Sequence, residues 1–155
     1  MDPWHAGMMH VSMTVPTDDL RKAPTIYPEL EALGYDRAFS FEAKHNPFLP
    51  LAVAAQHTER IQLGTAIAIA FARTPMTLAN AGWDLQTITG GRFALGLGSQ
   101  VRPHIVERYG MAWSRPAARR REMVLAIRAI WEAWETGGPL NFEGELYRHP
   151  RLVPA

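Results

Sequence analysis

The stretch IQLGTAIAIA, at residues 61–70, decides the fold class of this protein. Apart from Gln62 it is built from isoleucine, leucine, alanine, threonine and glycine, and apolar side chains do not alternate with polar ones. A strand buried on both faces has this pattern, and strands of a parallel sheet are buried in this way because helices cover both faces. We therefore expect one strand over residues 61–70, in a parallel sheet.

Strands and helices alternate on both sides of this stretch. The sequence predicts further strands at residues 9–15, 37–42 and 93–98. It predicts helices that begin at Pro28, Pro47, Pro75 and Pro116. Pro24 can open the first helix, but its regular part is expected to begin only at Pro28, because a proline inside a helix removes a hydrogen bond and clashes with the preceding turn. Gly90-Gly91 and Gly137-Gly138 are expected to end the last two helices.

Four strand–helix units follow one another, with the spacing of parallel crossover units. This order predicts an α/β fold with a parallel sheet and leaves two architectures, an open doubly wound sheet and a (β/α) barrel. Residues 140–147 alternate around Glu143-Gly144 and predict a small hairpin. We expect one domain over residues 1–155, with irregular structure at 1–8 and 149–155.

A second stretch, GGRFALGLGSQ at residues 90–100, raises the question of a phosphate-binding loop. The dinucleotide-binding pattern needs a glycine where Val101 stands, and the P-loop pattern needs a Gly-Lys-Ser/Thr ending that this chain lacks. We expect the apolar part to form a buried strand, whose Gly98 leaves room for a flat ligand to approach the backbone. Ser99 and Gln100 then lie at the carboxyl end of a parallel strand, where ligands bind in α/β folds.

Two other predicted strand ends carry polar side chains. Glu42 and His45 follow the second strand, and Arg73 follows the third. Each alone is typical of a solvated loop, but their occurrence at successive strand ends favours a binding site at the carboxyl edge of the sheet. By contrast, we expect the run Arg119–Arg121 to be the solvated face of a helix.

The composition excludes several classes of protein. The chain has no cysteine, so disulfides, thiolate metal sites and cysteine nucleophiles are excluded. Its histidines lack the spacing of a zinc-protease motif, and we expect no metal. A formal net charge of +1 does not indicate a basic surface for binding nucleic acid or an anionic membrane. No apolar run approaches the ~18 residues that a helix needs to span a bilayer. We therefore expect a cytoplasmic protein that binds a small-molecule substrate, with no nucleic acid and no membrane as partner.

Several motifs, in their order and spacing, resemble one family. They are Gly34-Tyr35-Asp36, TERIQLGT at 58–65, Arg73-Thr74-Pro75, GGRFALGLG at 90–98, Trp131-Glu132 and FEGELY at 142–147. Together they resemble the bacterial luciferase-like oxidoreductases, and the deazaflavin-dependent branch above all. The resemblance extends over residues 9–148.

This resemblance implies a TIM barrel that binds a flavin-type ring at the carboxyl ends of its strands. Members use reduced FMN with oxygen, or a deazaflavin, coenzyme F420, that passes a hydride. In the deazaflavin branch a cis peptide bond lies in a bulge, which corresponds here to the bond between Ala66 and Ile67. The resemblance implies that the cofactor-binding residues are Thr65, Ala66, Ile67, Ser99 and Gln100. It implies a catalytic proton carrier at Glu42 or His45 and does not decide between them.

Family members are about twice as long as this chain, which supplies about four of the eight barrel units. We expect a half barrel plus the C-terminal hairpin. It is a truncated gene or fragment, a half that pairs as a homodimer or with a missing C-terminal half, or the product of a misread frame. The leading function is F420-dependent hydride transfer with an alcohol or reduced-carbon substrate. The alternatives are an FMN-dependent monooxygenase, a non-catalytic half-barrel module that dimerises, and an unrelated α/β binding or phosphosugar domain.

Overall fold

The computed structural model describes residues 9–16 and 18–152, which form two compact units. The first unit takes in the chain up to Ala66 together with Leu85–Leu95. The second takes in Ile67–Asp84 and the chain from Gly96 onward. Residues 1–8, for which we expect irregular structure, lie outside the described residues, and so do residues 153–155 of the expected irregular C-terminal segment.

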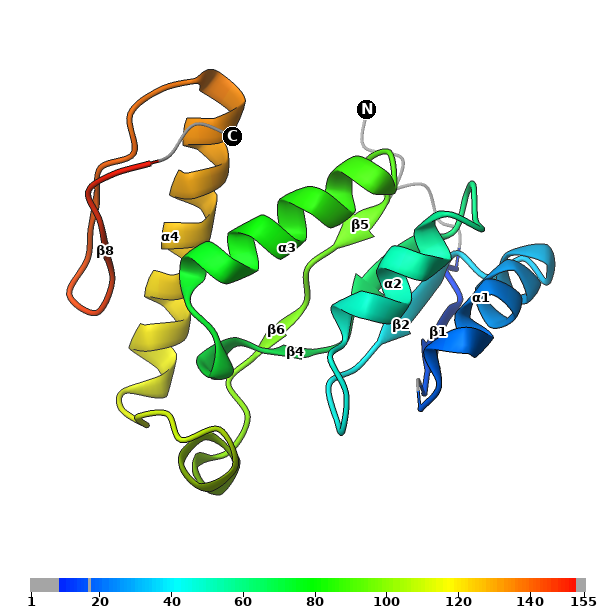
Figure 1. Ribbon diagram of the computed structural model, residues 1–155, viewed down its shortest axis with the longest axis horizontal. Helices are drawn as coiled ribbons and strands as arrows, with labels where there is room; N and C mark the ends of the chain where they lie inside the picture. The colour runs from blue at the N-terminus through cyan, green and yellow to red at the C-terminus, as the bar shows by residue number, and fades with distance from the viewer. Residues whose placement is uncertain (1–8, 17, 153–155) are drawn as a thin grey trace. The chain divides into compact units, whose positions relative to one another are not determined.

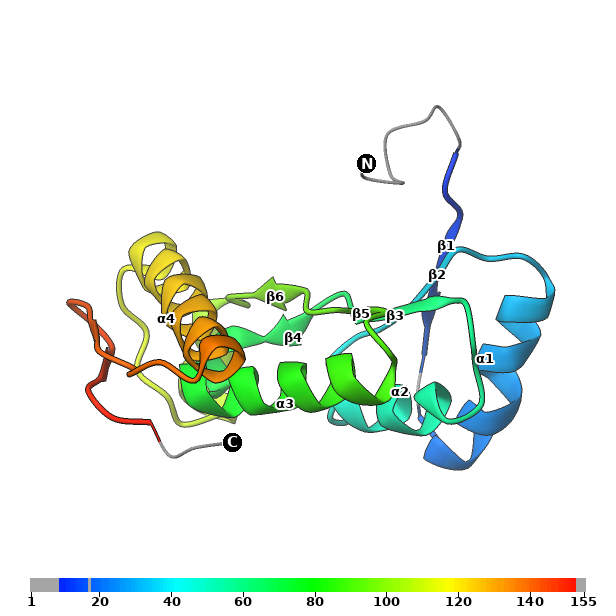
Figure 2. The same ribbon diagram turned by 90° about the horizontal axis from the view of Figure 1, so that it is seen from above.

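The first unit contains the parallel sheet that the sequence predicts. Its strands are β1 (Ser12–Val15), β2 (Arg37–Ser40), β3 (Gln62–Thr65) and β5 (Phe93–Ala94). They pair in the order β1-β2-β3-β5, and every pair is parallel. Helices α1 (Ala23–Ala32) and α2 (Phe48–Ala55) pack side by side against this sheet, blue to cyan in Figures 1 and 2. The parallel α/β class is therefore confirmed.

Helix α1 begins at Ala23 with Pro24 in its first turn, which agrees with an opening at Pro24. It contains Pro28 in its interior, which corrects the prediction that the regular helix begins only there. The residues Ala23, Tyr27 and Leu30 repeat at helical spacing and are all buried. Burying that face outweighs the one backbone hydrogen bond that Pro28 cannot make, since tertiary packing supplies most of the stability of a helix in a protein.

Close packing in the middle of the sheet depends on Gly64 of β3. A Cβ atom at this position would lie 2.7 Å from the carbonyl oxygen of Ala94 and 2.8 Å from Cε1 of Phe39. Phe39 is the register partner of Gly64 on β2, and Ala94 is its partner on β5. Only glycine therefore lets these three strands pair with the Phe39 ring lying across the middle one.

The turn that leads into β3 is held by one carboxylate, that of Glu31 near the end of α1. Its oxygens accept hydrogen bonds from the backbone N–H groups of Glu59 (3.1 Å), Arg60 (2.7 Å) and Ile61 (2.7 Å). Partial burial opposes ionisation of this carboxyl, but the three N–H donors outweigh burial and hold the pKa of Glu31 below its ordinary value of 4.5.

Replacing Glu31 by glutamine is expected to lower the free energy of unfolding at pH 7 by about 1 kcal/mol, because water partly screens the charged contacts that are lost. The folded-state pKa lies below the unfolded one, so the carboxylate contributes fully above about pH 4.5 and loses its contribution as the pH falls through the folded value. Urea unfolding at pH 7 and pH 3 measures this. A difference between the two proteins that stays constant down to pH 3 would contradict it.

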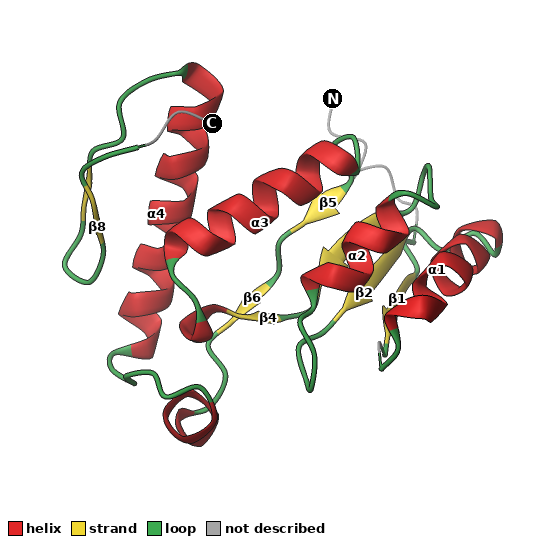
Figure 3. Cartoon of the chain, viewed as in Figure 1, coloured by secondary structure: helices red, strands yellow, loops and turns green. Residues whose placement is uncertain are grey.

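The second unit contains a two-stranded parallel pair, most of one long helix, all of another and a hairpin (Figure 3). The pair is β4 (Ala68–Ile69) and β6 (Leu97–Gly98). Helix α3 (Pro75–Ile88) begins in this unit at the predicted proline, and α4 (Pro116–Thr136) also begins at the predicted position. The hairpin of β7 (Phe142–Glu143) and β8 (Arg148–His149) confirms the prediction for this region, although His149 lies in a strand and not in an irregular tail.

Each of the two central predicted strands is in fact two strands. The predicted strand 61–70 breaks between β3 and β4, and the predicted strand 93–98 breaks between β5 and β6. The physical reason is a change of partner: β3 pairs with β2 and β5, whereas β4 pairs with β6. Residues 93–98 are half-buried and not buried as predicted, because β5 lies at an edge of the four-stranded sheet and β6 in a pair.

The prediction of a solvated helix face at Arg119–Arg121 is confirmed for Arg120 and Arg121, which are exposed, and is wrong for Arg119, which is half-buried. Its guanidinium lies 4.5 Å from the ring centroid of the buried Phe71. It donates hydrogen bonds to the hydroxyl of Tyr147 (2.9 Å) and to the carbonyl of Ala112 (2.5 Å). Arg119 thus joins α4 to the hairpin and to the loop before the helix.

Candidate active site

The loop that follows β2 carries both candidate catalytic residues and is held at its two ends. The hydroxyl of Ser40, the last residue of β2, donates to the carbonyl of Pro47 at 2.5 Å. The side chain of Asn46 accepts from the backbone N–H of Phe48, the first residue of α2, at 2.9 Å. Ser40 was missed as a positioning residue, and the signal available for it was a hydroxyl at a buried strand position.

Glu42 lies in this loop and is buried, with 9% of its surface exposed. A lone glutamate after a strand is usually solvated, so its burial separates it from an ordinary loop residue. Its neighbours Phe41 and Ala43 both line a surface pocket, whereas Glu42 does not. A buried carboxyl at the carboxyl end of a parallel strand is a chemically suitable proton carrier.

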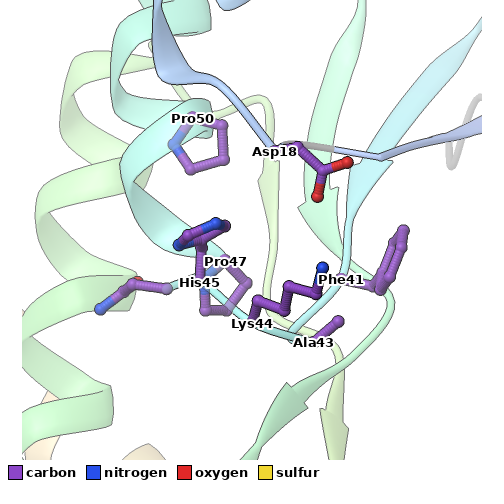
Figure 4. A pocket seen from close by; sticks show the side chains of 8 residues that line it. Asp18, Phe41, Ala43, Lys44, His45, Pro47 and Pro50 are labelled. Carbon is purple, nitrogen blue, oxygen red and sulfur yellow. The ribbon is translucent and has the colours of Figure 1, made fainter.

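His45 does line that pocket, which has a volume of about 80 Å³ and lies within the first unit. Figure 4 shows the Asp18 carboxylate and the Lys44 ammonium directed into the pocket from opposite sides, with the His45 ring at its wall. The remaining lining residues are Phe41, Ala43, Asn46, Pro47 and Pro50. The structure thus brings His45 together with Lys44 and Asp18 at this pocket, whereas Glu42 of the same loop is buried and does not line it.

The candidate cofactor-binding residues fall at the break between β3 and β4 and after β6. Thr65 ends β3 and is buried, while Ala66 is exposed and its N–H donates to the carbonyl of Ser40 at 2.7 Å. These two residues belong to the first unit, and Ile67, Ser99 and Gln100 belong to the second.

The space beside Gly98 is filled, which corrects the expectation that it admits a flat ligand. A Cβ atom at Gly98 would lie 2.6 Å from Cδ1 and 2.8 Å from Cγ1 of Ile67. The side chain of Ile67 therefore takes the place where a ligand ring was expected.

Backbone strain marks the residue after Ser99. Gln100 has a φ of +59°, in the left-handed region that residues other than glycine rarely adopt, and the hydroxyl of Ser99 donates to its carbonyl at 3.3 Å. Such strained residues gather at ligand-binding sites. The Ser99 hydroxyl and the Gln100 amide supply donors and acceptors that suit the carbonyl and N–H edge of a flavin-type heterocycle, so the residues present fit such a group.

Two features of the described residues bear on other functions. Within residues 9–16 and 18–152, no three histidine, aspartate or glutamate side chains are grouped as a metal site would need. Over the same part of the chain, every helix is too short or too polar to cross a membrane.

Comparison with known proteins places these features in a family. A family model described as luciferase-like monooxygenase matches residues 1–155. An uncharacterized protein of Mycobacterium tuberculosis is 54% identical over 137 residues, which are 88% of this chain and 40% of that protein. A second protein of the same organism, named as a coenzyme F420-dependent oxidoreductase, is 38% identical over 122 residues, which are 77% of this chain and 34% of that protein. The chain thus spans well under half the length of these relatives.

A solved structure supports the same assignment at the level of the fold. The oxygenating constituent of 3,6-diketocamphane monooxygenase from Pseudomonas putida, in complex with FMN, superposes with a TM-score of 0.78 at 19% identity. The match covers 94% of this chain and 45% of that one, so the chain corresponds to about half of a luciferase-like TIM barrel. The family has F420-dependent and FMN-dependent members. The chain belongs to the luciferase-like monooxygenase family.

Proposed function

We propose that this chain is part of an F420-dependent oxidoreductase that transfers a hydride between the deazaflavin and an alcohol or reduced-carbon substrate. The observation that carries the proposal is the 38% identity, over 77% of this chain, to the relative named as F420-dependent. The buried Glu42 and the strained Gln100, each after a parallel strand, support it.

The proposed roles follow from the chemistry of each side chain. Ser99 and Gln100 would hold the polar edge of the cofactor by hydrogen bonds, and Thr65, Ala66 and Ile67 would contact its ring. The cofactor, when bound, supplies the hydride chemistry. Glu42 accepts the proton of the substrate hydroxyl, or His45 does so from the pocket wall. The protein otherwise acts by orienting the two reactants.

Binding of the cofactor tests this proposal directly. The purified protein is titrated with coenzyme F420 and, separately, with FMN, and quenching of its tryptophan fluorescence is followed. The chain has 5 tryptophans, so a bound ring within energy-transfer distance gives a signal. Saturable binding of F420 at least tenfold tighter than FMN is the expected result.

The other possible results of the two titrations would each overturn a part of the proposal. Tighter binding of FMN would overturn the deazaflavin assignment in favour of a flavin monooxygenase. Binding of neither, by a sample shown to be folded by circular dichroism, would overturn the proposed function. In that case a dimer in sedimentation would instead support a non-catalytic module that pairs through this fold.

A further inference from the structure

We infer that Gly98 is a positioning residue: by lacking a side chain, it allows Ile67 to lie across β6 and so sets the backbone that faces the cofactor. The inference rests on the proposed function, in which Ile67 contacts the ring. Gly98 itself touches no ring in this arrangement, because Ile67 fills the space beside it.

The packing leaves Ile67 little freedom to move away from a new side chain. A Cβ atom at position 98 would lie 2.6 Å from Cδ1, 2.8 Å from Cγ1 and 3.4 Å from Cβ of Ile67. Rotating only the terminal methyl relieves the first contact and not the second. Isoleucine is stiff about χ1, so the second contact is relieved at the cost of an unfavourable rotamer or a shift of the backbone.

The backbone on either side of Ile67 is fixed by hydrogen bonds. The N–H of Ala66 donates to Ser40 at 2.7 Å, and the N–H of Ala68 donates to Gly96 at 2.9 Å. The register of β4 with β6 places Ile69 opposite Gly98. A displacement caused at position 98 is therefore confined to the short segment around Ile67, where the proposed function places the cofactor.

Two substitutions at position 67 separate the contacts. Valine removes Cδ1 and keeps a Cγ1 atom, so the 2.8 Å contact remains in a G98A/I67V protein. Alanine removes both atoms and leaves only the 3.4 Å contact, which is ordinary van der Waals distance, in a G98A/I67A protein. The control is Gly138→Ala, because a Cβ there meets a single atom within 4 Å, the Thr136 hydroxyl at 3.1 Å, and no backbone.

The experiment measures the Kd for coenzyme F420 by tryptophan quenching, and the thermal midpoint, for the wild type and these variants. We expect G98A to weaken F420 binding at least tenfold, G138A to change it less than threefold, and G98A/I67V to stay impaired. I67A is the reference for the double variant, because it removes a proposed ring contact of its own, and G98A/I67A should bind F420 within threefold of I67A. The thermal midpoint should fall in G98A and in G98A/I67V and should return close to that of I67A in G98A/I67A. This midpoint reports the packing in the absence of the cofactor.

Two results would overturn the inference while leaving the proposed function intact. One is wild-type F420 binding by a folded G98A protein. The other is rescue of the thermal midpoint in G98A/I67A without rescue of binding, which would make the contact purely structural. A wild-type protein that binds no F420 overturns the proposed function itself, and with it the inference that depends on it.

Discussion

Alanine at position 64 is expected to lower the free energy of unfolding by about 3 kcal/mol, the upper part of the range for overpacking a buried site. The new Cβ would lie 2.7 Å from the carbonyl oxygen of Ala94 and 2.8 and 2.9 Å from two atoms of the Phe39 ring. Neither neighbour can easily move away from the new atom. The carbonyl of Ala94 belongs to the paired strand β5, and Phe39 is the register partner of Gly64 on β2.

Urea unfolding followed by circular dichroism measures this loss, with Gly138→Ala as the control. Both substitutions replace a glycine by alanine and change the unfolded chain similarly. In the control the new Cβ meets only the Thr136 hydroxyl, at 3.1 Å, so its cost should stay below about 1 kcal/mol. Equal stability losses in the two variants would show that the close approach around Gly64 does not limit the packing of the sheet.

Glutamine in place of Glu42 is expected to slow hydride transfer by about 10²–10⁴-fold, the usual contribution of a positioned proton carrier. Glutamine keeps the shape of the side chain but cannot accept the proton. We expect Glu42 rather than His45 to carry it, because Glu42 is buried, whereas His45 is exposed at the wall of a surface pocket. The expectation depends on the proposed function.

The rate is measured from the absorbance of the oxidised deazaflavin in single turnovers, over a panel of primary and secondary alcohols. The matched variant is His45→Gln, for which we expect less than a tenfold loss. F420 affinity should stay within threefold in both variants, which separates a chemical role from a binding role. A large loss in His45→Gln and a small one in Glu42→Gln would exchange the two assignments.

The candidate site could be predicted only as a set of positions at strand ends. The order of the motifs placed Glu42 and Ser99-Gln100 after parallel strands, and the structure has them there. The burial of Glu42 and the left-handed backbone of Gln100 could not be predicted, because each depends on packing with residues distant in the chain. The contact between Ile67 and Gly98 could not be predicted either, because these two residues are distant in the sequence.

The sequence by itself determined the parallel α/β class, the helix starts at Pro75 and Pro116, the hairpin and the family. These features follow from local patterns, since apolar periodicity, prolines and glycines act over a few residues. Only the tertiary structure decided where the two central strands break and that α1 runs through Pro28. Strand breaks depend on which partner each segment pairs with, and Pro28 is accepted because distant residues bury the other face of its helix. Both features depend on the free energy of contacts between residues that are distant in the sequence. No short stretch of sequence contains those contacts.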